Sequence, residues 1–346
     1  MSTPYTILEH ADLAARNTLR VAATARWSAT VFDVAALPAV LMLPQFAGLP
    51  SLVLGEGSNV LFAADYPGVV LRIAAAAVRI EPMGEDAAVV HAEAGANWDA
   101  LVEQSLAAGW SGLENLALIP GLAGAAPIQN IGAYGVELDE FVHSVTAWDR
   151  TTGRTHELTR AECGFGYRDS RFRRDADRWI VTHLCLRLPR QHALRLDYSG
   201  VSEELAAMGV SDPTPHAVAV AVRRIRRRKL PDPAEIGNAG SFFKNPVVAA
   251  SQATALRSAH PGLPVYPTGS AGKSKLSAAW LIEACGWRGQ RVGDAGVADR
   301  HALVLVNHGT ASGHELLELA RRIAASVSER FGVQLEPEPR IVGAAF

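Results

Sequence analysis

The sequence contains few cysteines, carries almost no net charge and has no long apolar run. Its three cysteines, Cys163, Cys185 and Cys285, are odd in number and lack the close spacing of zinc ligands, so they predict neither a disulfide framework nor a metal site. Against 35 acidic residues stand 33 lysines and arginines, and the net charge of -2 gives no general attraction to nucleic acid or to an anionic membrane. A reducing cytoplasm is therefore the expected location.

Targeting and membrane signals are also missing. The start of the chain lacks a basic region followed by an apolar core, and the longest apolar stretch, residues 34–43, is short and interrupted by Pro38. We expect neither a signal peptide nor a membrane span. Internal repeats and low-complexity tracts are absent as well.

What is present indicates a globular protein of mixed α and β structure. A chain of 346 residues with 49% apolar and 20% charged residues can form two or three packed domains. Segments with strand character, such as SLVLGEGSNVLF and AAVVHAEAG, alternate with a few helices that have a clear apolar face. The predicted helices begin near Trp98, Pro215, Leu276 and Ser312 and end before Gly109, Pro231, Gly286 and Gly332. A change of composition at PDPAEIGNAG predicts a domain boundary near Lys229.

Two glycine-rich segments are candidates for binding a nucleotide cofactor. In LGEGSN, residues 54–59, the glycines and backbone N–H groups suit a phosphate, although a plain hairpin between two strands has the same pattern. The segment IPGLAGAAPIQNIGAYG, residues 119–135, carries almost no charge, so its backbone could approach a pyrophosphate or a flavin ring; a buried crossover loop is the alternative. Neither segment is the Gly-x-Gly-x-x-Gly fingerprint of a Rossmann unit.

Charged segments leave both a functional and a structural interpretation open. The basic run at residues 223–229 suits a helix C-terminus in solvent, but six basic residues in seven positions could also include one or two phosphate ligands. In GYRDSRFRR, Arg168 is either part of a surface ion pair or a fork for a carboxylate. Glu336 and Glu338 in LEPEPR follow the last helix, where a solvated tail is usual. A lone hydroxyl, Ser241, stands in GNAGSFFKNP, which neither helix nor strand periodicity explains.

Taken in order, seven segments carry a resemblance to a known family. They are LGEGSNVLF, GLENLALIPGLAGAAPIQNIGAYGVE, CGFGYRDSRFR, KLPDPAEIGNAGSFFKNPVV, KLSAAWLIEACGWRGQRVG, ALVLVN and FGVQLEPEPR. Together they resemble the UDP-N-acetylenolpyruvoylglucosamine reductases, flavoenzymes of bacterial peptidoglycan precursor synthesis, from about residue 17 to residue 340. The segments NAGSFFKNP and PIQNIGAYG are highly specific, whereas the glycine turns are not.

The resemblance implies an α+β protein with an FAD-binding fold of the vanillyl-alcohol-oxidase type and a separate substrate domain. The two α+β FAD-binding subdomains would occupy residues 1–75 and 76–228. An α+β substrate-binding domain would occupy residues 229–330, and residues 331–346 would return to the active site and the FAD domain. The implied protein is a cytoplasmic monomer that binds FAD, NADPH and a sugar nucleotide, with no metal, nucleic acid or membrane partner.

The resemblance also assigns roles to individual residues. The family's proton-donating serine matches Ser241, its arginine in GYRDS matches Arg168, and its C-terminal glutamate matches Glu338. The implied FAD-binding residues are Gly55, Glu56, Gly57, Ser58, Asn59, Ile119, Pro120, Gly121, Gly124, Ala125, Gln129, Asn130, Gly132 and Arg226. The implied substrate-binding residues are Tyr134, Tyr167, Tyr198, Lys229, Asn245, Lys275 and His301.

The implied reaction explains why these residue types occur together. NADPH reduces FAD, and reduced N5 then delivers hydride to C3 of the enolpyruvyl ether, so negative charge collects at C2 and its carboxylate. Arg168 would stabilise this charge, Glu338 would stay protonated or position Arg168, and Ser241 would protonate C2. The product is UDP-N-acetylmuramate.

The chain departs from the family pattern at two positions. Pro339 follows Glu338 where relatives have valine, and His301 in VADRHALVL stands where relatives have a substrate-binding glutamine. Imidazole can still donate one hydrogen bond at this position.

Two other functions remain compatible with parts of the sequence. A different FAD-dependent oxidoreductase of the same fold would keep the glycine-rich loops but would not need NAGSFFKNP. A nucleotide-binding or nucleic-acid-binding module would need only the basic run at residues 223–229. Such a module would carry no yellow cofactor.

Overall fold

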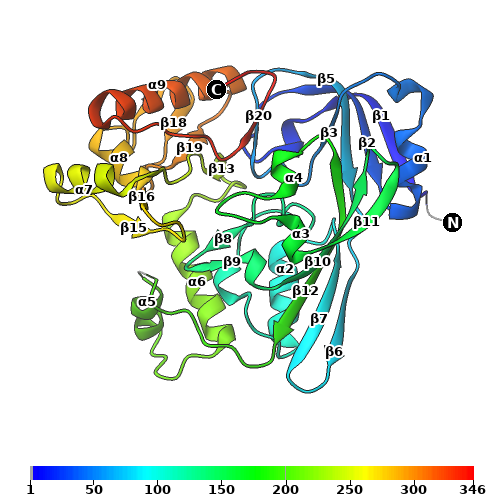
Figure 1. Cartoon of the computed structure of the whole chain (residues 1–346). Coiled ribbons are helices and arrows are strands. Elements are labelled where there is room, and N and C mark those ends of the chain that lie inside the picture. The colour runs from blue at the N-terminus through cyan, green and yellow to red at the C-terminus, as the bar shows by residue number, and fades with distance from the viewer. Residues whose placement is uncertain (1–2, 199) are drawn as a thin grey trace. The chain divides into compact units, whose positions relative to one another are not determined.

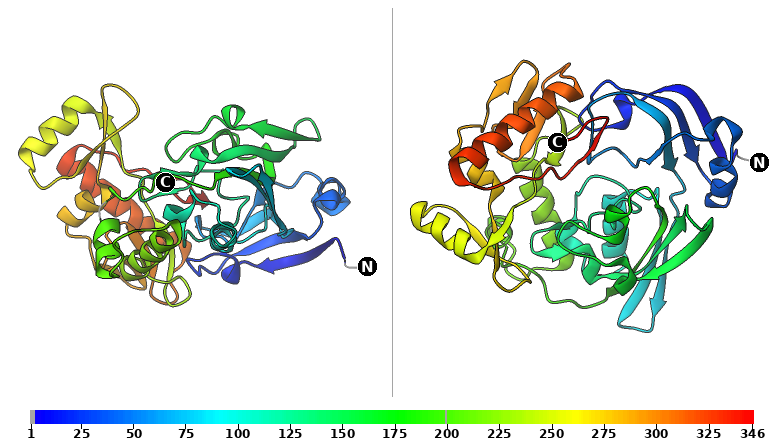
Figure 2. Two further views of the ribbon diagram at one scale, coloured as in Figure 1. Left: turned by 90° about the horizontal axis from the view of Figure 1, so that it is seen from below. Right: turned by 45° about the horizontal axis from the view of Figure 1, so that its top comes forward.

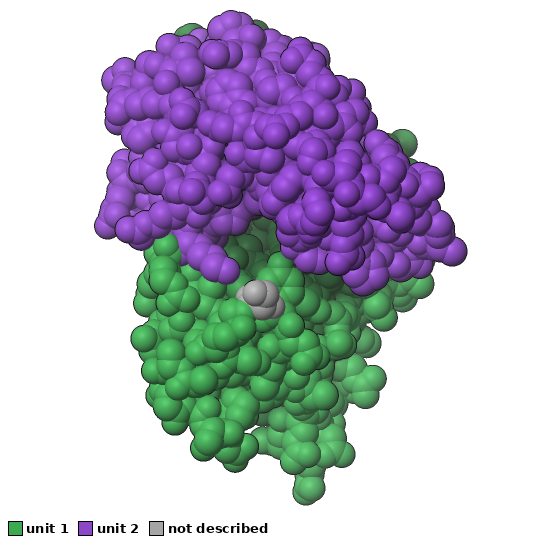
Figure 3. All heavy atoms as spheres, turned by 90° about the vertical axis from the view of Figure 1, so that its left-hand side faces the viewer, with its two compact units in different colours: residues 1–11, 25–56, 67–228 green, residues 12–24, 57–66, 229–346 purple. Residues whose placement is uncertain are grey.

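The structure is a computed structural model that describes residues 3–198 and 200–346 (Figures 1 and 2). The chain divides into two compact units, coloured separately in Figure 3. Unit 1 comprises residues 1–11, 25–56 and 67–228, and unit 2 comprises residues 12–24, 57–66 and 229–346.

Two sheets form most of unit 1. The first has the order β1-β2-β5-β3, with β3 parallel to β5, and the second has the order β11-β10-β12-β7-β6, with neighbouring strands antiparallel. The strands of the first sheet are β1 (Tyr5–Asp12), β2 (Thr24–Val31), β3 (Ser51–Val53) and β5 (Tyr66–Ile73). Those of the second are β6 (Val78–Met83), β7 (Ala87–Glu93), β10 (Val142–Asp149), β11 (Arg154–Thr159) and β12 (Trp179–Pro189).

The remaining elements of unit 1 are helices and a two-stranded ribbon. The helices are α1 (Leu37–Leu41), α2 (Trp98–Ala107), α3 (Arg160–Cys163), α4 (Arg171–Arg174), α5 (Val201–Ala207) and α6 (Pro215–Lys229), and the ribbon is β8 (Gly132–Ala133) with β9 (Val136–Glu137). Unit 1 also contains short 3₁₀ turns at Val34–Ala36, Pro44–Phe46, Glu114–Leu116 and Leu138–Glu140, and a further 3₁₀ turn, Ala14–Arg16, belongs to unit 2.

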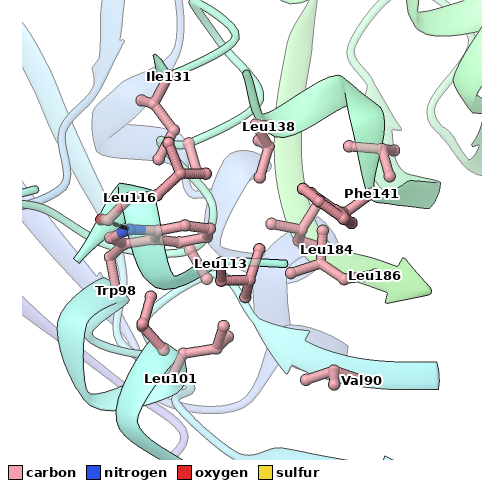
Figure 4. Close-up of a cluster of buried hydrophobic side chains, with 14 of the residues drawn as sticks. Val90, Trp98, Leu101, Leu113, Leu116, Ile131, Leu138, Phe141, Leu184 and Leu186 are labelled. Atoms are coloured by element: carbon pink, nitrogen blue, oxygen red, sulfur yellow. Dashed lines mark hydrogen bonds between the residues drawn. The ribbon is translucent and has the colours of Figure 1, made fainter. Parts of the chain in front are cut away.

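One apolar cluster joins α2 to the inner face of the five-stranded sheet. Trp98 and Leu101 of α2 are fully buried together with Val90, Leu184 and Leu186 of the sheet (Figure 4). Each such side chain stabilises the fold by roughly 1.5–3 kcal/mol relative to an exposed one. The indole N–H of Trp98 donates to the Leu116 carbonyl at 2.9 Å, so its burial leaves no polar group unpaired.

Unit 2 contains three sheets and the last three helices. Their orders are β13-β19-β18-β17, β14-β16-β15 and a parallel pair, β20-β4. The strands are β4 (Val60–Phe62), β13 (Gly237–Ser241), β14 (Val247–Ala249), β15 (Val265–Pro267), β16 (Lys273–Leu276), β17 (Arg291–Val292), β18 (Ala295–Val297), β19 (Val304–Asn307) and β20 (Arg340–Val342). The helices are α7 (Ala250–Ala259), α8 (Ala278–Ala284) and α9 (Gly313–Phe331).

The four helices expected from the sequence are confirmed. Helix α9 begins after Ser312, whose side chain accepts from the Glu315 N–H, and it ends at Gly332 with φ 63°. Gly109 and Gly286 likewise have positive φ just after α2 and α8. The sequence analysis did not predict helices α5 and α7.

Two expectations about strands are wrong. SLVLGEGSNVLF is not a hairpin, because β3 pairs with β5 and β4 pairs with β20, each in parallel. Partners that lie elsewhere in the chain cannot be read from the local pattern. GNAGSFFKNP does contain a strand, since β13 pairs with β19 across a bulge between Asn238 and Ser241. In the described part of the chain, no helix combines the length and the apolar character that a membrane crossing requires.

Gly313 provides a test of the packing in unit 2. A Cβ at this position would lie 1.7 Å from the Phe62 carbonyl oxygen, so Gly313→Ala forces α9 away from the end of β4. Overpacking of this kind costs about 1–3 kcal/mol. We expect a lower urea midpoint for Gly313→Ala in tryptophan fluorescence. Gly269→Ala is the control, because a Cβ there meets nothing within 4 Å; equal midpoints for the two variants would contradict the packing described.

Candidate active site

Main-chain hydrogen bonds bring Ser241 and Glu338 together in unit 2. The Glu338 N–H donates to the Phe242 carbonyl at 2.8 Å, and the Lys244 N–H donates to the Glu336 carbonyl at 3.0 Å. Residues 242–244 therefore run antiparallel to residues 336–338, with Phe243 opposite Pro337. Ser241 directly precedes Phe242, whose carbonyl accepts from the Glu338 N–H. The pairing therefore brings together the backbones of two residues to which the family resemblance assigns catalytic roles. The interpretation of residues 336–338 as a solvated tail is therefore wrong, because the backbone of this segment is hydrogen-bonded to residues 242–244.

The turn before Ser241 is held by a residue that the sequence analysis missed. Asn238 is buried; its amide donates to the Pro231 and Ile236 carbonyls at 3.1 and 3.0 Å, and its Oδ1 accepts from the Gly240 N–H at 3.0 Å. Gly240 has φ 68°, a conformation that favours glycine. The hydroxyl of Ser241, which is half-buried, makes no hydrogen bond to any residue in the described ranges. The asparagine three residues before a glycine-flanked serine is the signal that could have identified it.

The glycine-rich loop at residues 54–59 connects to the same C-terminal segment. The Arg340 N–H donates to the Asn59 carbonyl at 3.1 Å, and the Asn59 side chain donates to the Glu338 carbonyl at 3.5 Å. Gly57 has φ 67°, and a Cβ there would lie 2.1 Å from the Arg16 carbonyl oxygen, so only glycine fits. The unit 2 end of this loop is thus fixed next to Glu338.

Other predicted residues of unit 2 occupy defined positions near this ladder. Lys244 forms an ion pair with Glu336 at 3.4 Å, so its ammonium has a carboxylate partner rather than Ser241. Asn245 Oδ1 accepts from the Ala278 N–H at the start of α8 at 2.9 Å, and its amide nitrogen has no acceptor among the residues that the structure describes. Lys275 lies on β16, with Nζ 6.0 Å from the Tyr266 ring centroid.

His301 is partly buried and lies next to a positive charge. Burial lowers the pKa of its imidazole, the charge of Lys229 lowers the pKa further, and Glu283 opposes this shift. Nδ1 accepts from the Leu303 N–H at 3.3 Å, which assigns the proton of the neutral ring to Nε2. His301 can therefore donate one hydrogen bond from Nε2, as the side-chain amide of glutamine does.

In unit 1, Arg168 is anchored to the second glycine-rich loop. Its guanidinium donates to the Gly132 carbonyl at 2.5 Å and to the Asn130 carbonyl at 3.5 Å, and it lies 5.3 Å from the Tyr167 ring centroid. The backbone at Arg168 has φ 51°, a sparsely populated conformation for arginine. Arg173 holds the same loop by donating to Gln129 Oε1 at 3.0 Å. The interpretation of Arg168 as part of a simple surface salt bridge does not account for these carbonyl contacts.

The start of the second loop is fixed by α2 and α6. The Leu118 N–H donates to Asp99 at 2.7 Å, and the Leu118 carbonyl accepts from Arg226 Nε at 3.1 Å. Burial raises the pKa of the Tyr134 phenol, and the neighbouring Arg226 opposes this shift. Tyr134 also packs edge-on against Tyr198, at 5.5 Å between ring centroids. Arg226, Tyr134 and Tyr198 therefore form one connected group.

Most of the remaining basic run has a structural role. Arg223 pairs with Asp99 and Glu103 at 2.9 and 2.8 Å, and Arg224 and Arg228 pair with the buried Glu204 at 3.0 and 2.7 Å. A buried carboxylate requires such partners. These arginines stabilise unit 1 and are not a general surface for a polyanion.

Backbone amides of the two glycine-rich loops fit a nucleotide cofactor. Gly57 and Gly121 are buried, yet no backbone or side-chain acceptor for their N–H groups occurs in the parts of the chain that the structure describes. Buried N–H groups rarely lack an acceptor, so these two suit the oxygens of a bound pyrophosphate or the carbonyls of a flavin. Gly55 and Gly124 keep the same loops free of side chains. The chemistry of each loop, taken by itself, therefore suits a nucleotide cofactor such as FAD.

Comparison with protein families identifies a flavoprotein. Residues 28–159 match the FAD binding domain, and residues 232–342 match the C-terminal domain of UDP-N-acetylenolpyruvoylglucosamine reductase. With the glycine-rich loops described above, these matches define the class as FAD-dependent oxidoreductases of the vanillyl-alcohol-oxidase-type fold.

Individual proteins place the chain within that class. It is 55% identical over 342 residues to the UDP-N-acetylenolpyruvoylglucosamine reductase of Xanthomonas euvesicatoria, covering 99% of this chain and 98% of the relative. It is also 55% identical to the protein of that name from Xylella fastidiosa, again with 99% and 98% coverage. The crystal structure of the Thermus caldophilus reductase superimposes with a TM-score of 0.65 at 26% identity and covers 98% of each chain. The chain belongs to the UDP-N-acetylenolpyruvoylglucosamine reductase family.

The partly buried imidazole of His301 predicts a pH dependence of stability. Its folded-state pKa is lowered from the ordinary value of about 6.5, so below about pH 6.5 the unfolded chain binds a proton there more readily than the folded chain does. Acidification through this range therefore lowers the free energy of unfolding. His301→Gln removes that contribution, so its urea midpoint should fall less than the parent's between about pH 7.5 and 5.5. Parallel decreases for the two proteins would show that His301 does not titrate differently on folding.

Proposed function

We propose that the chain reduces the enolpyruvyl group of UDP-N-acetylenolpyruvoylglucosamine to form UDP-N-acetylmuramate for peptidoglycan synthesis, with FAD as cofactor and NADPH as reductant. Membership of the reductase family over 99% of the chain carries this proposal. The main-chain ladder that places Glu338 beside the Ser241 segment supports it at the level of residues.

When bound, FAD would supply the two-electron chemistry that couples oxidation of NADPH to reduction of the substrate. The protein must then stabilise negative charge at C2 and its carboxylate. Arg168, a permanent cation with a planar fork, has this role, and removing a comparable oxyanion donor costs about 2.7–4 kcal/mol in other enzymes. Ser241 donates the proton to C2 from a hydroxyl that no described protein group engages. Glu338 orients the donor region through its backbone bond to Phe242.

The remaining assigned residues bind ligands. FAD would be held by residues 55–59 and by Ile119, Pro120, Gly121, Gly124, Ala125, Gln129, Asn130, Gly132 and Arg226. Lys229 binds the diphosphate of the substrate, and His301, whose pKa Lys229 lowers, donates from Nε2 nearby. Tyr198, half exposed and packed on Tyr134, covers the nucleotide. Tyr167, Asn245 and Lys275 complete the set of substrate contacts.

The wider setting of the protein follows from the same proposal. It acts as a monomer in the cytoplasm; the free thiols Cys163, Cys185 and Cys285 and the NADPH requirement support the reducing location. It needs neither nucleic acid nor a membrane. We retain residues 1–75, 76–228 and 229–330 as the three domains and residues 331–346 as the returning C-terminal segment.

A different FAD-dependent oxidoreductase of this fold is the alternative. NAGSFFKNP argues against it, because the specific turn held by Asn238 serves a proton donor that other flavin reactions do not require. A nucleic-acid-binding module is disfavoured since Arg223, Arg224 and Arg228 are engaged in ion pairs within unit 1.

Anaerobic absorption spectroscopy tests the function. The purified protein should be yellow, NADPH should bleach it, and the enolpyruvyl sugar nucleotide should restore the colour in the absence of oxygen. Protein that stays colourless and takes up no added FAD would overturn the assignment. Yellow protein that NADPH bleaches but this substrate does not recolour would favour the alternative oxidoreductase.

Lys229→Ala should mainly raise KM for the sugar nucleotide, because a diphosphate contact is equally strong in the ground state and the transition state. The expected increase is about tenfold or more, with kcat within about twofold of the parent, since one charge-assisted hydrogen bond is worth roughly 1.5–3 kcal/mol. Arg227→Ala, in the same basic run, is the matched control and should leave both constants unchanged. A lower kcat at unchanged KM would move Lys229 into the chemical step.

A further inference from the structure

A second cluster of reactive side chains lies on the five-stranded sheet of unit 1, apart from every residue assigned above. His91 on β7 and Cys185 on β12 are direct cross-strand partners, and Glu81 lies on the adjoining strand β6 (Figure 1). Their side chains form a chain of contacts: Cys185 Sγ is 3.3 Å from His91 Nδ1, and His91 Nε2 is 3.2 Å from Glu81 Oε2. A carboxylate on Nε2 fixes the ring proton there and leaves Nδ1 as an acceptor for the thiol proton.

A groove of about 610 Å³ opens over this cluster. Ile80, Pro82, Met83 and Val89 give it apolar walls, and His143 and Glu157 add polar groups near Cys185. On the other side of the sulfur, Ser144 pairs with Cys185 across the sheet and donates to Glu157 at 2.7 Å. The groove has room for a small organic molecule directly over a cysteine with an oriented base.

A metal ion is not the preferred occupant. Among the described residues, no group of three or more histidine, cysteine or carboxylate side chains has the geometry to hold one. The contacts from the sulfur to the imidazole and from the imidazole to the carboxylate instead form the arrangement in which an adjacent base activates a nucleophile.

We propose that Cys185 is a site of thiol–disulfide exchange, at which small-molecule disulfides that enter this groove modify the protein. Sγ attacks one sulfur of the disulfide while His91 Nδ1 takes the thiol proton. The new bond joins Cys185 to that sulfur, the old S–S bond breaks, and the proton passes from His91 to the departing thiolate. The products are a mixed disulfide on the protein and one small thiol, so no further oxidant is consumed.

The role of His91 follows from the burial of the sulfur. Cys185 is only 7% exposed, and this burial raises the pKa of its thiol, an effect that the Ser144 hydrogen bond and Arg79 oppose and Glu157 reinforces. The resting sulfur is therefore a thiol and needs a base at the moment of attack. Without His91, a sulfur this buried would react slowly.

The other two cysteines are internal controls. Cys285 is more exposed than Cys185, but within the described part of the chain the only hydrogen-bond partner of its Sγ is the Ser326 carbonyl, at 3.6 Å. Cys163 is fully buried, and burial raises its pKa to about 12. If solvent exposure alone controlled the rate, Cys285 would react faster than Cys185. If an oriented base controls the rate, Cys185 reacts faster.

Cystamine is a suitable probe, and the FAD-loaded full chain is the sample. Peptide mapping by mass spectrometry after timed incubation should show Cys185 modified about tenfold or more faster than Cys285, with Cys163 unmodified. His91→Gln should slow the modification of Cys185 by about 10²-fold, the lower end of the range for a lost general base, and leave the rate at Cys285 unchanged. His143→Gln, which alters the same groove at a residue with no hydrogen bond to Cys185 among the described residues, should keep the parent rate.

Two results would overturn the proposal. The first is that Cys285 of the parent protein is modified faster than Cys185. The second is that Cys185 is modified at the same rate in His91→Gln as in the parent. Modification of Cys163 in a variant would show that the variant has lost its fold. If this happens in His91→Gln, Glu81→Gln replaces it as the test variant, because Glu81 is exposed. Glu81→Gln should slow the modification of Cys185 severalfold while Cys163 stays unmodified. An unchanged rate in a folded Glu81→Gln protein would also contradict the proposal.

Discussion

The antiparallel pairing of residues 242–244 with residues 336–338 is the interaction on which the proposed active site depends. Two backbone hydrogen bonds, from Glu338 to Phe242 and from Lys244 to Glu336, join a loop in the middle of unit 2 to the C-terminal end of the chain. The same C-terminal segment continues into β20, which pairs with β4 directly after the glycine-rich loop. The proposed proton donor, Glu338 and Asn59 are thus positioned by main-chain bonds, which tolerate side-chain change better than side-chain contacts do.

Buried polar side chains fix the irregular segments around this pairing. Asn238 sets the turn before Ser241, and Asn307 donates to the Leu19 and Ala311 carbonyls at 3.1 Å each while accepting from the Gly309 and Ala311 N–H groups at 3.0 Å. In unit 1, the amide nitrogen of Asn115 donates to the main-chain carbonyls of Tyr134 and Arg195 at 2.9 Å each. Asn238 and Asn307 each use both the amide N–H donors and the Oδ1 acceptor, so one side chain satisfies several backbone groups that have left regular structure.

Local signals were sufficient for much of the fold. The apolar spacing and end residues of α2, α6, α8 and α9 predicted these helices, because caps and periodicity act over a few residues. The partners of β3 and β4 could not be predicted, since parallel pairs join segments far apart in the chain. Strand β13 was missed because its glycines hide a bulged strand that only pairing with β19 stabilises.

The site was predicted mainly by family resemblance and less by physical pattern. Loop composition indicated backbone ligands, and the amides of Gly57 and Gly121 agree with that interpretation. No local pattern indicated that Glu338 lies beside the Ser241 segment, or that Arg223, Arg224 and Arg228 are used in ion pairs. Those facts depend on tertiary structure, where distant segments supply the partners.

The most direct measurement is stopped-flow kinetics of the two flavin half-reactions, recorded separately without oxygen, for Ser241→Ala and Ser241→Cys. If Ser241 protonates C2, NADPH should reduce the flavin of the alanine variant at the parent rate, since that step does not involve the enol ether. Reoxidation by the sugar nucleotide should slow by about 10²–10⁴-fold, and cysteine should restore part of the loss because it keeps a donor. Reoxidation of the alanine variant at the parent rate would contradict the central role of Ser241.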